Sequence, residues 1–269
     1  MTKAKTNKHG ITIHSEEDFE GMRVAGKLAA SVLDMIAEHV KPGVTTDKLN
    51  QLCHEMTVNV GAVSAPLNYK GFPKSICTSI NHVVCHGIPD DKKLQNGDLI
   101  NIDVTVIVDG WHGDTSRMFW AGKVPIKAQR LTSVTYDAMM YGIEQVRPGA
   151  TVGDIGHAVQ SHAEMNGFSV VRDYCGHGTG KVFHAPPNIL HYGRPGEGLV
   201  LEEGMFFTVE PMVNVGKKDT KLSKYDGWTV TTKDRSLSAQ FEHTLGVTAD
   251  GFEIFTSSPK HLDRPPYEV

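Results

Sequence analysis

The chain has 269 residues and a formal net charge of −4 at pH 7, with 27 lysines and arginines against 31 aspartates and glutamates. This balance gives no reason to expect DNA as a partner. No stretch is apolar enough for a membrane span or a secretory signal, so we expect a cytoplasmic protein without membrane contact. The four cysteines form no CxxC pair, which is typical of reduced thiols rather than of a disulfide framework or a zinc knuckle.

The amino-terminal segment MTKAKTNKHG (residues 1–10) is rich in lysine and poor in apolar residues. This composition predicts a disordered basic tail, for which a transient contact with RNA or the ribosome is an open alternative. A helix is expected from Ser15, which can cap it together with Asp18, and Lys-Pro-Gly at residues 41–43 ends it. Thr46 is expected to cap a second helix.

The same helix–turn–helix arrangement recurs in the second half of the chain. An offset of 106 residues aligns Pro42 with Pro148. The same offset also aligns Gly43 with Gly149, Thr45 with Thr151, Leu49 with Ile155, and Gly61 with Gly167. Pro-Gly after a helix is a common stop signal, so a chance match is the alternative. Five matches at one offset favour a duplication, and predict two similar α+β halves, residues 15–120 and 127–255, whose sheets meet in the middle.

Residues 101–119, NIDVTVIVDGWHGDTSRMF, have the pattern of a β-hairpin, and Asp109-Gly110 is the expected two-residue turn. That turn places Asp103 and Asp114 on one face of the hairpin as diagonal neighbours, roughly 7–8 Å apart at Cα. Aspartate is disfavoured inside strands, and two carboxylates at this separation repel each other unless a cation lies between them. The hairpin therefore indicates a metal site, with a solvated outer face as the alternative.

Four further segments contain polar side chains suited to a site between the halves. Glu210 ends an apolar strand in MFFTVEPM, and Glu242 lies in a predicted strand in LSAQFEHTLGV. His177 lies between glycines in CGHGTGKVFHAPP, His184 follows it in the same segment, and His86 lies in VVCHGIPD. Any one of these histidines by itself is more often a core or surface residue. Their combination with misplaced carboxylates indicates a functional site.

The metal-ligand candidates are four carboxylates and one imidazole: Asp103, Asp114, His177, Glu210 and Glu242. This set exceeds the three protein ligands that a catalytic tetrahedral zinc usually has. It suits two divalent ions bridged by carboxylates, as in dinuclear hydrolases. The absence of a thiolate ligand favours cobalt, manganese or iron, and zinc and nickel stay open.

With these segments in view, the chain resembles the bacterial-type (type I) methionine aminopeptidases of metallopeptidase family M24, from about Ile11 to the carboxyl terminus. The matching motifs are KSICTSINHVVCHGIP, NIDVTVIVDGWHGDTSRMF, CGHGTGKVFHAPP, FTVEPM and AQFEHT. The resemblance implies an α+β pita-bread fold with two pseudo-symmetric halves and a central antiparallel sheet, formed as one catalytic domain by residues 11–269. It also implies a monomer that removes the initiator methionine from nascent polypeptide N-termini when the second residue is small.

The resemblance further implies roles for individual side chains. It implies the same five metal ligands, catalytic or substrate-orienting roles for His86 and His184, and Glu210 is our candidate for moving a proton. The side chain of methionine would enter an apolar slot lined by Tyr69, Phe72, Cys77, Phe183 and Trp228, although any one of these could be an ordinary core residue.

Two positions depart from the family pattern. Ala185 and Pro186 stand where an acidic residue commonly follows the second histidine, and Pro66 replaces a small or thiol residue near the pocket. Neither position is a ligand, so these differences concern pocket shape and inhibitor response. Two other interpretations remain. An Xaa-Pro aminopeptidase or prolidase shares the fold and ligands but usually has an extra N-terminal domain. A non-catalytic pita-bread protein that binds RNA or a partner would need a degenerate site.

Overall fold

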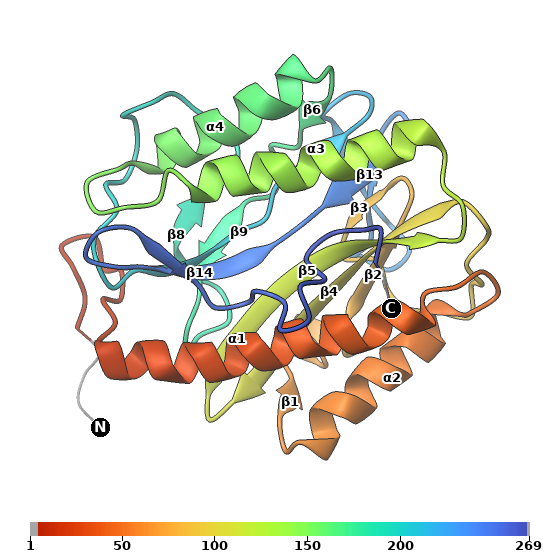
Figure 1. Ribbon diagram of the computed structural model, residues 1–269, viewed down its shortest axis with the longest axis horizontal. Coiled ribbons are helices and arrows are strands. Elements are labelled where there is room, and N and C mark those ends of the chain that lie inside the picture. Colours follow the sequence, from red (N-terminus) through yellow and green to blue (C-terminus); the bar gives the residue numbers. More distant parts are fainter. Residues whose placement is uncertain (1–4, 268–269) are drawn as a thin grey trace.

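The structure is a computed structural model that describes residues 5–267, and Figure 1 shows its helices and strands. The helices are α1 (Glu16–Ile36), α2 (Thr46–Asn59), α3 (Ile126–Ile143) and α4 (Val152–Met165), with short 3-10 helices at Ala37–His39 and Tyr69–Gly71. In Figure 1, α1 and α2 lie below the strands and α3 and α4 lie above them. Within residues 5–267, no helix combines the length and apolarity that crossing a membrane would require.

The strands form four sheets of three to five strands each. They are β1 (Val63–Ser64), β2 (Cys77–Ile80), β3 (Val83–Cys85), β4 (Asp98–Val108), β5 (Trp111–Ala121), β6 (Ser169–Val170), β7 (Gly176–Gly178), β8 (Ala185–Ile189), β9 (Phe206–Val209), β10 (Met212–Asn214), β11 (Thr220–Leu222), β12 (Val230–Thr232), β13 (Ser238–Gln240), β14 (His243–Val247) and β15 (Phe252–Ile254). One sheet has the order β1-β4-β2 with β5 paired to β4, and another has the order β15-β14-β9-β7-β8. All the pairs are antiparallel.

The first two helices begin close to the predicted positions. The Asp18 carboxylate accepts a hydrogen bond from the Ser15 N–H at 2.9 Å, as the predicted capping box requires. The predicted cap of α2 was wrong by one residue, because Thr45 is the N-cap and its hydroxyl accepts a first-turn N–H at 3.1 Å. Thr46 is the first helical residue, and its hydroxyl instead accepts the N–H of Asp90 at 2.9 Å.

The two helix pairs share their local geometry. Thr151 caps α4 as Thr45 caps α2. The preceding glycines, Gly43 and Gly149, have φ angles of +91° and +87°, a region that residues with a Cβ rarely adopt. The predicted α+β class with two related halves is confirmed by this arrangement of helices and sheets. The residue limits proposed for the halves stay a prediction.

The β4–β5 hairpin has the predicted register. Asp109 and Gly110 form the turn with φ angles of +49° and +84°, as a two-residue turn of this type requires. Thr105 lies opposite Asp114, and Asp103, two residues before Thr105, projects from the same face. The turn chemistry therefore places two carboxylates on one face without help from distant residues.

The sheets of the two halves meet at β5. The N–H of Glu242 donates to the carbonyl of Ser116 at 3.0 Å, and the Thr244 hydroxyl donates to the carbonyl of Asp114 at 2.6 Å. Glu242 was expected inside a strand and instead lies between β13 and β14, because its backbone forms this isolated bridge with β5. The bridge brings a carboxylate from the second half beside the hairpin of the first.

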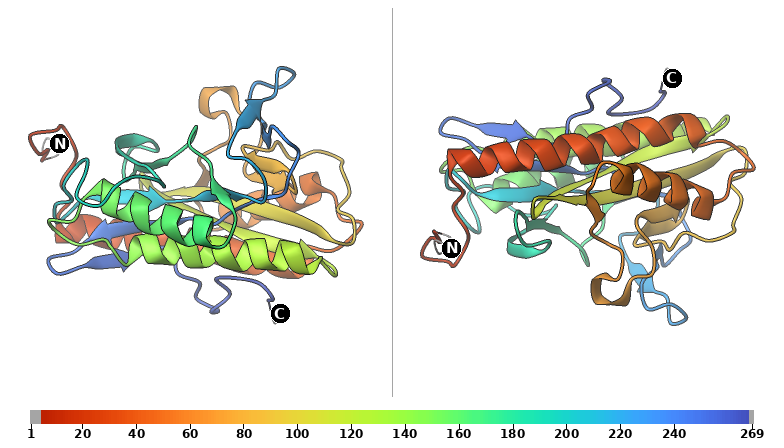
Figure 2. Two further views of the ribbon diagram at one scale, coloured as in Figure 1. Left: turned by 90° about the horizontal axis from the view of Figure 1, so that it is seen from above. Right: turned by 90° about the horizontal axis from the view of Figure 1, so that it is seen from below.

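Apolar helix faces cover the sheets. Leu33 and Ile36 of α1 belong to one fully buried cluster with Ile100 and Ile102 of β4, and a second cluster packs α3 and α4 against strands of the second half. Figure 2 shows α1 and α3 on one side of the strands and the β11–β12 hairpin projecting from the other. The helices thus pack against the sheets, and the strands of these sheets carry the site residues.

Residues 5–10 of the amino-terminal segment make contacts with the rest of the chain, and the disorder expected from their composition stays a prediction. The Asn7 side chain accepts the N–H groups of His9 and Ile11 at 2.9 and 3.0 Å and donates to Glu202 at 2.7 Å. Ile11 is buried in the core. These contacts, which composition could not reveal, hold the segment on the surface; residues 1–4 of the predicted tail lie outside the described residues.

Candidate metal centre

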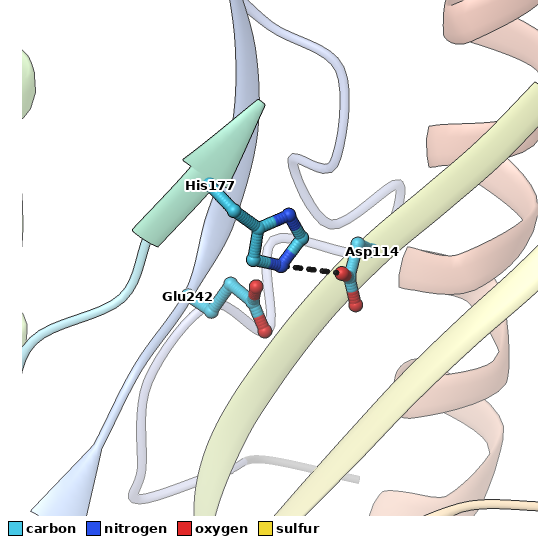
Figure 3. A group of neighbouring side chains, drawn as sticks. All are labelled: Asp114, His177 and Glu242. Carbon is cyan, nitrogen blue, oxygen red and sulfur yellow. Dashed lines mark ion pairs between the residues drawn. The ribbon is translucent and has the colours of Figure 1, made fainter. Parts of the chain in front are cut away.

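The five predicted ligands converge on one cavity of about 540 Å³. Figure 3 shows Asp114 from β5, His177 from β7 and Glu242 pointing toward one another. Their ligand atoms all lie within 4.8 Å of one another. Asp103 on β4 and Glu210, which directly follows β9, line the same cavity. Strands from both halves thus bring together all the residues predicted as ligands.

His177 presents a free lone pair to the carboxylates. Its Nδ1 lies 3.2 Å from the carbonyl oxygen of Gly178, and because a carbonyl only accepts, Nδ1 carries the proton. Nε2 lies 3.6 Å from Asp114 Oδ2 and 3.6 Å from Glu210 Oε1. Burial lowers the pKa of His177 to about 4. The imidazole is therefore neutral at pH 7 and oriented as a metal ligand requires.

Each buried carboxylate disfavours the ionised form of its neighbours. Burial raises the pKa of Asp103, Glu210 and Glu242 well above the usual carboxyl range, and repulsion from Asp114 raises it further. Burial also raises the pKa of Asp114 to about 6, although a 2.6 Å hydrogen bond from the Thr105 hydroxyl opposes this shift. Four carboxylates in one cavity can all be anionic only when positive charge balances them, so this oxygen-rich set fits divalent cations.

Two further polar side chains, neither of which we predicted from the sequence, orient Glu210. The Thr208 hydroxyl donates to Glu210 Oε1 at 2.8 Å, and the Gln240 amide donates to Glu210 Oε2 at 3.2 Å. Thr208 lies two residues before Glu210, and Gln240 lies two residues before Glu242. Residues two apart in a strand point to the same face. A polar residue two positions before a predicted ligand could therefore have indicated these two side chains from the sequence.

His86 and His184 line the same cavity as the five ligand candidates. His86 directly follows β3 in a positive-φ conformation, and its ring packs edge-on against Tyr174 at 5.7 Å. The ring of His184 lies 4.2 Å from that of His177 and stacks on Tyr69 at 5.2 Å between centroids. Burial is the main factor that lowers the pKa of both His86 and His184. Each is a neutral imidazole that can donate one hydrogen bond and accept another.

The residues predicted to line an apolar slot all border the same cavity: Tyr69, Phe72, Cys77, Phe183 and Trp228. Phe72 packs edge-on against Trp228 with ring centroids 5.2 Å apart, and Tyr69 lies 4.8 Å from Phe183. Cys77 is a free, buried thiol whose residue pairs with Asp103 across β2 and β4. The aromatic walls therefore lie next to the ligands rather than in a separate core.

The positions that depart from the family pattern also contact the cavity. Pro66, Ala185 and Pro186 are all among its lining residues. Alanine and proline contribute no charge to the cavity wall, whereas an acidic side chain would add a negative charge. None of the three positions is one of the five ligands, and their effect on pocket shape stays a prediction.

Comparison with known proteins agrees with this geometry. A family model described as metallopeptidase family M24 matches residues 20–249. Methionine aminopeptidase of Rickettsia prowazekii is 71% identical over 257 residues, which cover 96% of this chain and 99% of that protein. Methionine aminopeptidase of Escherichia coli K12 is 56% identical, over 91% of this chain and 94% of its own.

Solved structures show the same relationship. The crystal structure of methionine aminopeptidase from Rickettsia prowazekii superposes with a TM-score of 0.91, covering 91% of this chain and 99% of that one. An Xaa-Pro dipeptidase from Bacillus anthracis superposes with a TM-score of 0.74 but is only 21% identical, and 64% of its chain is covered, so it shares the fold alone. The chain belongs to metallopeptidase family M24 and, within it, to the methionine aminopeptidases.

Proposed function

We propose that this chain hydrolyses the first peptide bond of proteins and peptides that begin with methionine, when the second residue is small. The observation that supports this most strongly is the position of four carboxylates and a neutral imidazole at the wall of an aromatic-lined cavity. The 71% identity to a methionine aminopeptidase supports the same reaction. Such a cavity can hold an apolar N-terminal side chain while its peptide bond lies beside the ligands.

We propose that two divalent cations bind to Asp103, Asp114, His177, Glu210 and Glu242. Carboxylates that border one another in this way are suited to bridging two ions, and cobalt, manganese or iron are the favoured ions, with zinc and nickel as alternatives. When bound, such ions supply Lewis-acid polarisation of a carbonyl and activation of water. The Nδ1 contact of His177 with Gly178 supports this role, because it leaves Nε2 free.

The protein's own groups position the substrate and move protons. His184, neutral and open to the cavity, donates a hydrogen bond to the scissile carbonyl oxygen as negative charge develops there. His86, on the other side, orients the amide that is cut. Glu210 accepts a proton from the attacking water and passes it to the leaving nitrogen. The low pKa values of the two histidines support these roles, since each must be neutral and hydrogen-bonding at pH 7.

Methionine selectivity is assigned to the aromatic walls and the thiol of Cys77. A thioether gains about 0.3–1.5 kcal/mol from each contact with an aromatic ring, and the slot includes Tyr69, Phe72, Phe183 and Trp228. The preference for a small second residue is proposed to arise because the ligands lie deep between the two halves and leave little room beyond the bond that is cut. Pro66 and Ala185 line the same cavity and are proposed to alter its shape.

The natural substrates are proposed to be nascent polypeptide N-termini in the cytoplasm, and the enzyme to act as a monomer formed by one domain over residues 11–269. The lysines of the amino-terminal segment support a transient ribosome contact, because ribosomal RNA is a polyanion. Lys5 and Lys8 are the described lysines of that segment.

The decisive experiment is metal add-back. Protein stripped of metal should not cleave a Met-Gly-X peptide, and manganese, iron or cobalt should restore cleavage and release free methionine. A Leu-Gly-X peptide is the matched control for the side chain. Protein that binds divalent ions at the five ligands but releases no methionine with any of them would refute the proposed activity.

A further inference from the structure

We propose that Thr208 is a positioning residue for the metal centre: its hydroxyl couples the ligands His177 and Glu210 and sets the direction in which Glu210 presents its oxygens. This inference rests on the proposed function, because it concerns how the same five ligands bind their ions. Thr208 lies on β9, and its side chain is fully buried. Thr208 is not among the residues that line the cavity, so it acts only through the side chains that it contacts.

Thr208 fills a gap in the strand pairing. The pairing between β7 and β9 consists of the single partner pair Gly178 and Phe207, and on its other side the pairing of β7 with β8 shifts register between His177 and Gly178. The N–H of His177 donates instead to the Thr208 hydroxyl oxygen at 3.0 Å. A side-chain oxygen therefore replaces a backbone acceptor at the residue that supplies the imidazole.

The direction of the hydrogen bonds is determined by chemistry. An amide N–H can only donate, so the Thr208 oxygen accepts from His177, and its one hydroxyl proton is free for another acceptor. That acceptor is Glu210 Oε1, at 2.8 Å. A bond in this direction favours the ionised carboxylate, the form that binds a cation.

The remaining contacts of Glu210 complete its orientation. Gln240 donates to Oε2 at 3.2 Å, and the Glu210 N–H donates to Nε2 of the fully buried His191 at 3.0 Å. Each carboxylate oxygen accepts one protein donor and keeps a second lone pair for an ion. Thr208 differs from the other two because it alone also contacts a second ligand, so its loss alters two ligands at once.

Two substitutions separate this role from ordinary packing. Thr208→Val keeps the β-branched shape but removes the hydroxyl, while Thr208→Ser keeps the hydroxyl. Thr135→Val is the matched control, because Thr135 is equally buried and its hydroxyl donates at 2.8 Å to the Leu131 carbonyl inside α3. Thr135→Val loses one buried hydrogen bond inside a helix, whereas Thr208→Val loses two, one with each of the proposed ligands His177 and Glu210.

The readouts are the dissociation constants of manganese, measured by titration calorimetry, and the visible absorption spectrum of the cobalt-loaded protein. Thr208→Val should weaken binding of at least one ion by about 10- to 100-fold, as is typical when a group that orients a ligand is removed, and should shift the cobalt spectrum. Its kcat should fall more than its KM changes. The manganese dissociation constants of Thr208→Ser should stay within about threefold of wild type, well below the roughly 10- to 100-fold loss expected for valine. Thr135→Val should leave both the dissociation constants and the cobalt spectrum unchanged.

Unchanged manganese binding and an unchanged cobalt spectrum in Thr208→Val would overturn the proposal while leaving the proposed aminopeptidase activity intact. If the valine variant does not fold, Thr208→Ala is compared with Thr208→Ser: equal affinities in these two variants would refute a role for the hydroxyl, and a loss confined to alanine would support it. Wild-type protein that binds no divalent ion would instead contradict the proposed function itself.

Discussion

Replacing Asp114 by asparagine tests the metal centre most directly, because it removes one charge and keeps the side-chain shape. Asp114 is buried, and its Oδ2 lies 3.6 Å from His177 Nε2. Two unit charges 4 Å apart near a protein surface interact by about 4 kcal/mol. An ion held by these ligands lies closer and has two charges, so Asp114→Asn should lose at least about 4 kcal/mol of binding, or roughly a thousandfold in affinity.

A second effect acts in the opposite direction. In the metal-free protein Asp114 repels Asp103, Glu210 and Glu242, and this repulsion contributes to their raised pKa values. Asp114→Asn removes this repulsion, so the remaining carboxylates lose their protons more easily and protons compete less with the ions. This effect offsets only part of the lost attraction, because the ion itself is attracted to Asp114 at closer range and with two charges.

The assay measures bound metal per protein after dialysis against a fixed free manganese concentration, together with cleavage of a Met-Gly-X peptide. Asp109→Asn is the matched control, because Asp109 is exposed at the hairpin turn and asparagine tolerates its φ of +49°. Metal content and activity should fall together in Asp114→Asn and stay normal in Asp109→Asn. Full metal occupancy with normal turnover in Asp114→Asn would show that Asp114 is not a metal ligand.

Three further outcomes are expected. His184→Ala should lower kcat by about 10²–10³ with metal content unchanged, and turnover within about threefold of wild type would show that this side chain is no carbonyl donor. The kcat/KM for a Met-Ala-X peptide should exceed that for Leu-Ala-X by about a few hundredfold, because two or three pocket contacts contribute about 1–3 kcal/mol each. Met-Lys-X should also be a poor substrate. Similar kcat/KM values for all three peptides would indicate a broad aminopeptidase. Burial lowers the pKa of His243 to about 3, whereas unfolded histidine has a pKa of about 6.5. The unfolded chain therefore binds this proton first, and the contribution of His243 to stability is complete above pH 6.5 and is lost as the pH falls toward 3. Urea unfolding of metal-free protein should show a loss between pH 7 and pH 5 that is about 2 kcal/mol larger in wild type than in His243→Gln, and an equal loss in both would contradict a buried neutral imidazole.

The hairpin shows how far local sequence can reach. Asp109-Gly110 favours one turn type, that turn sets the register, and the register alone places Asp103 and Asp114 on one face. The first helix followed from Ser15 and its capping box in the same way. These features depend on residues that are close in the sequence, so they could be predicted without knowing the rest of the fold.

Local reasoning failed where a distant segment competed for the same group. Both Thr45 and Thr46 can cap a helix, and only the contact of Thr46 with Asp90, 44 residues away, decides between them. The composition of the amino-terminal segment likewise does not reveal the contact of Asn7 with Glu202, 195 residues away. In each case the deciding hydrogen bond joins residues that the sequence does not show to be neighbours.

Misplaced carboxylates and glycine-flanked histidines predicted the metal ligands from the sequence, and the resemblance of its motifs to methionine aminopeptidases indicated their roles. How these side chains are held in place depends on contacts between distant segments of the fold. The bridge from Glu242 to Ser116 joins the second half to the hairpin, and Thr208 links His177 to Glu210 where strand pairing is interrupted. The physical reason is that a ligand is oriented by donors at hydrogen-bond distance, and those donors come from whichever strands the packed helices bring alongside.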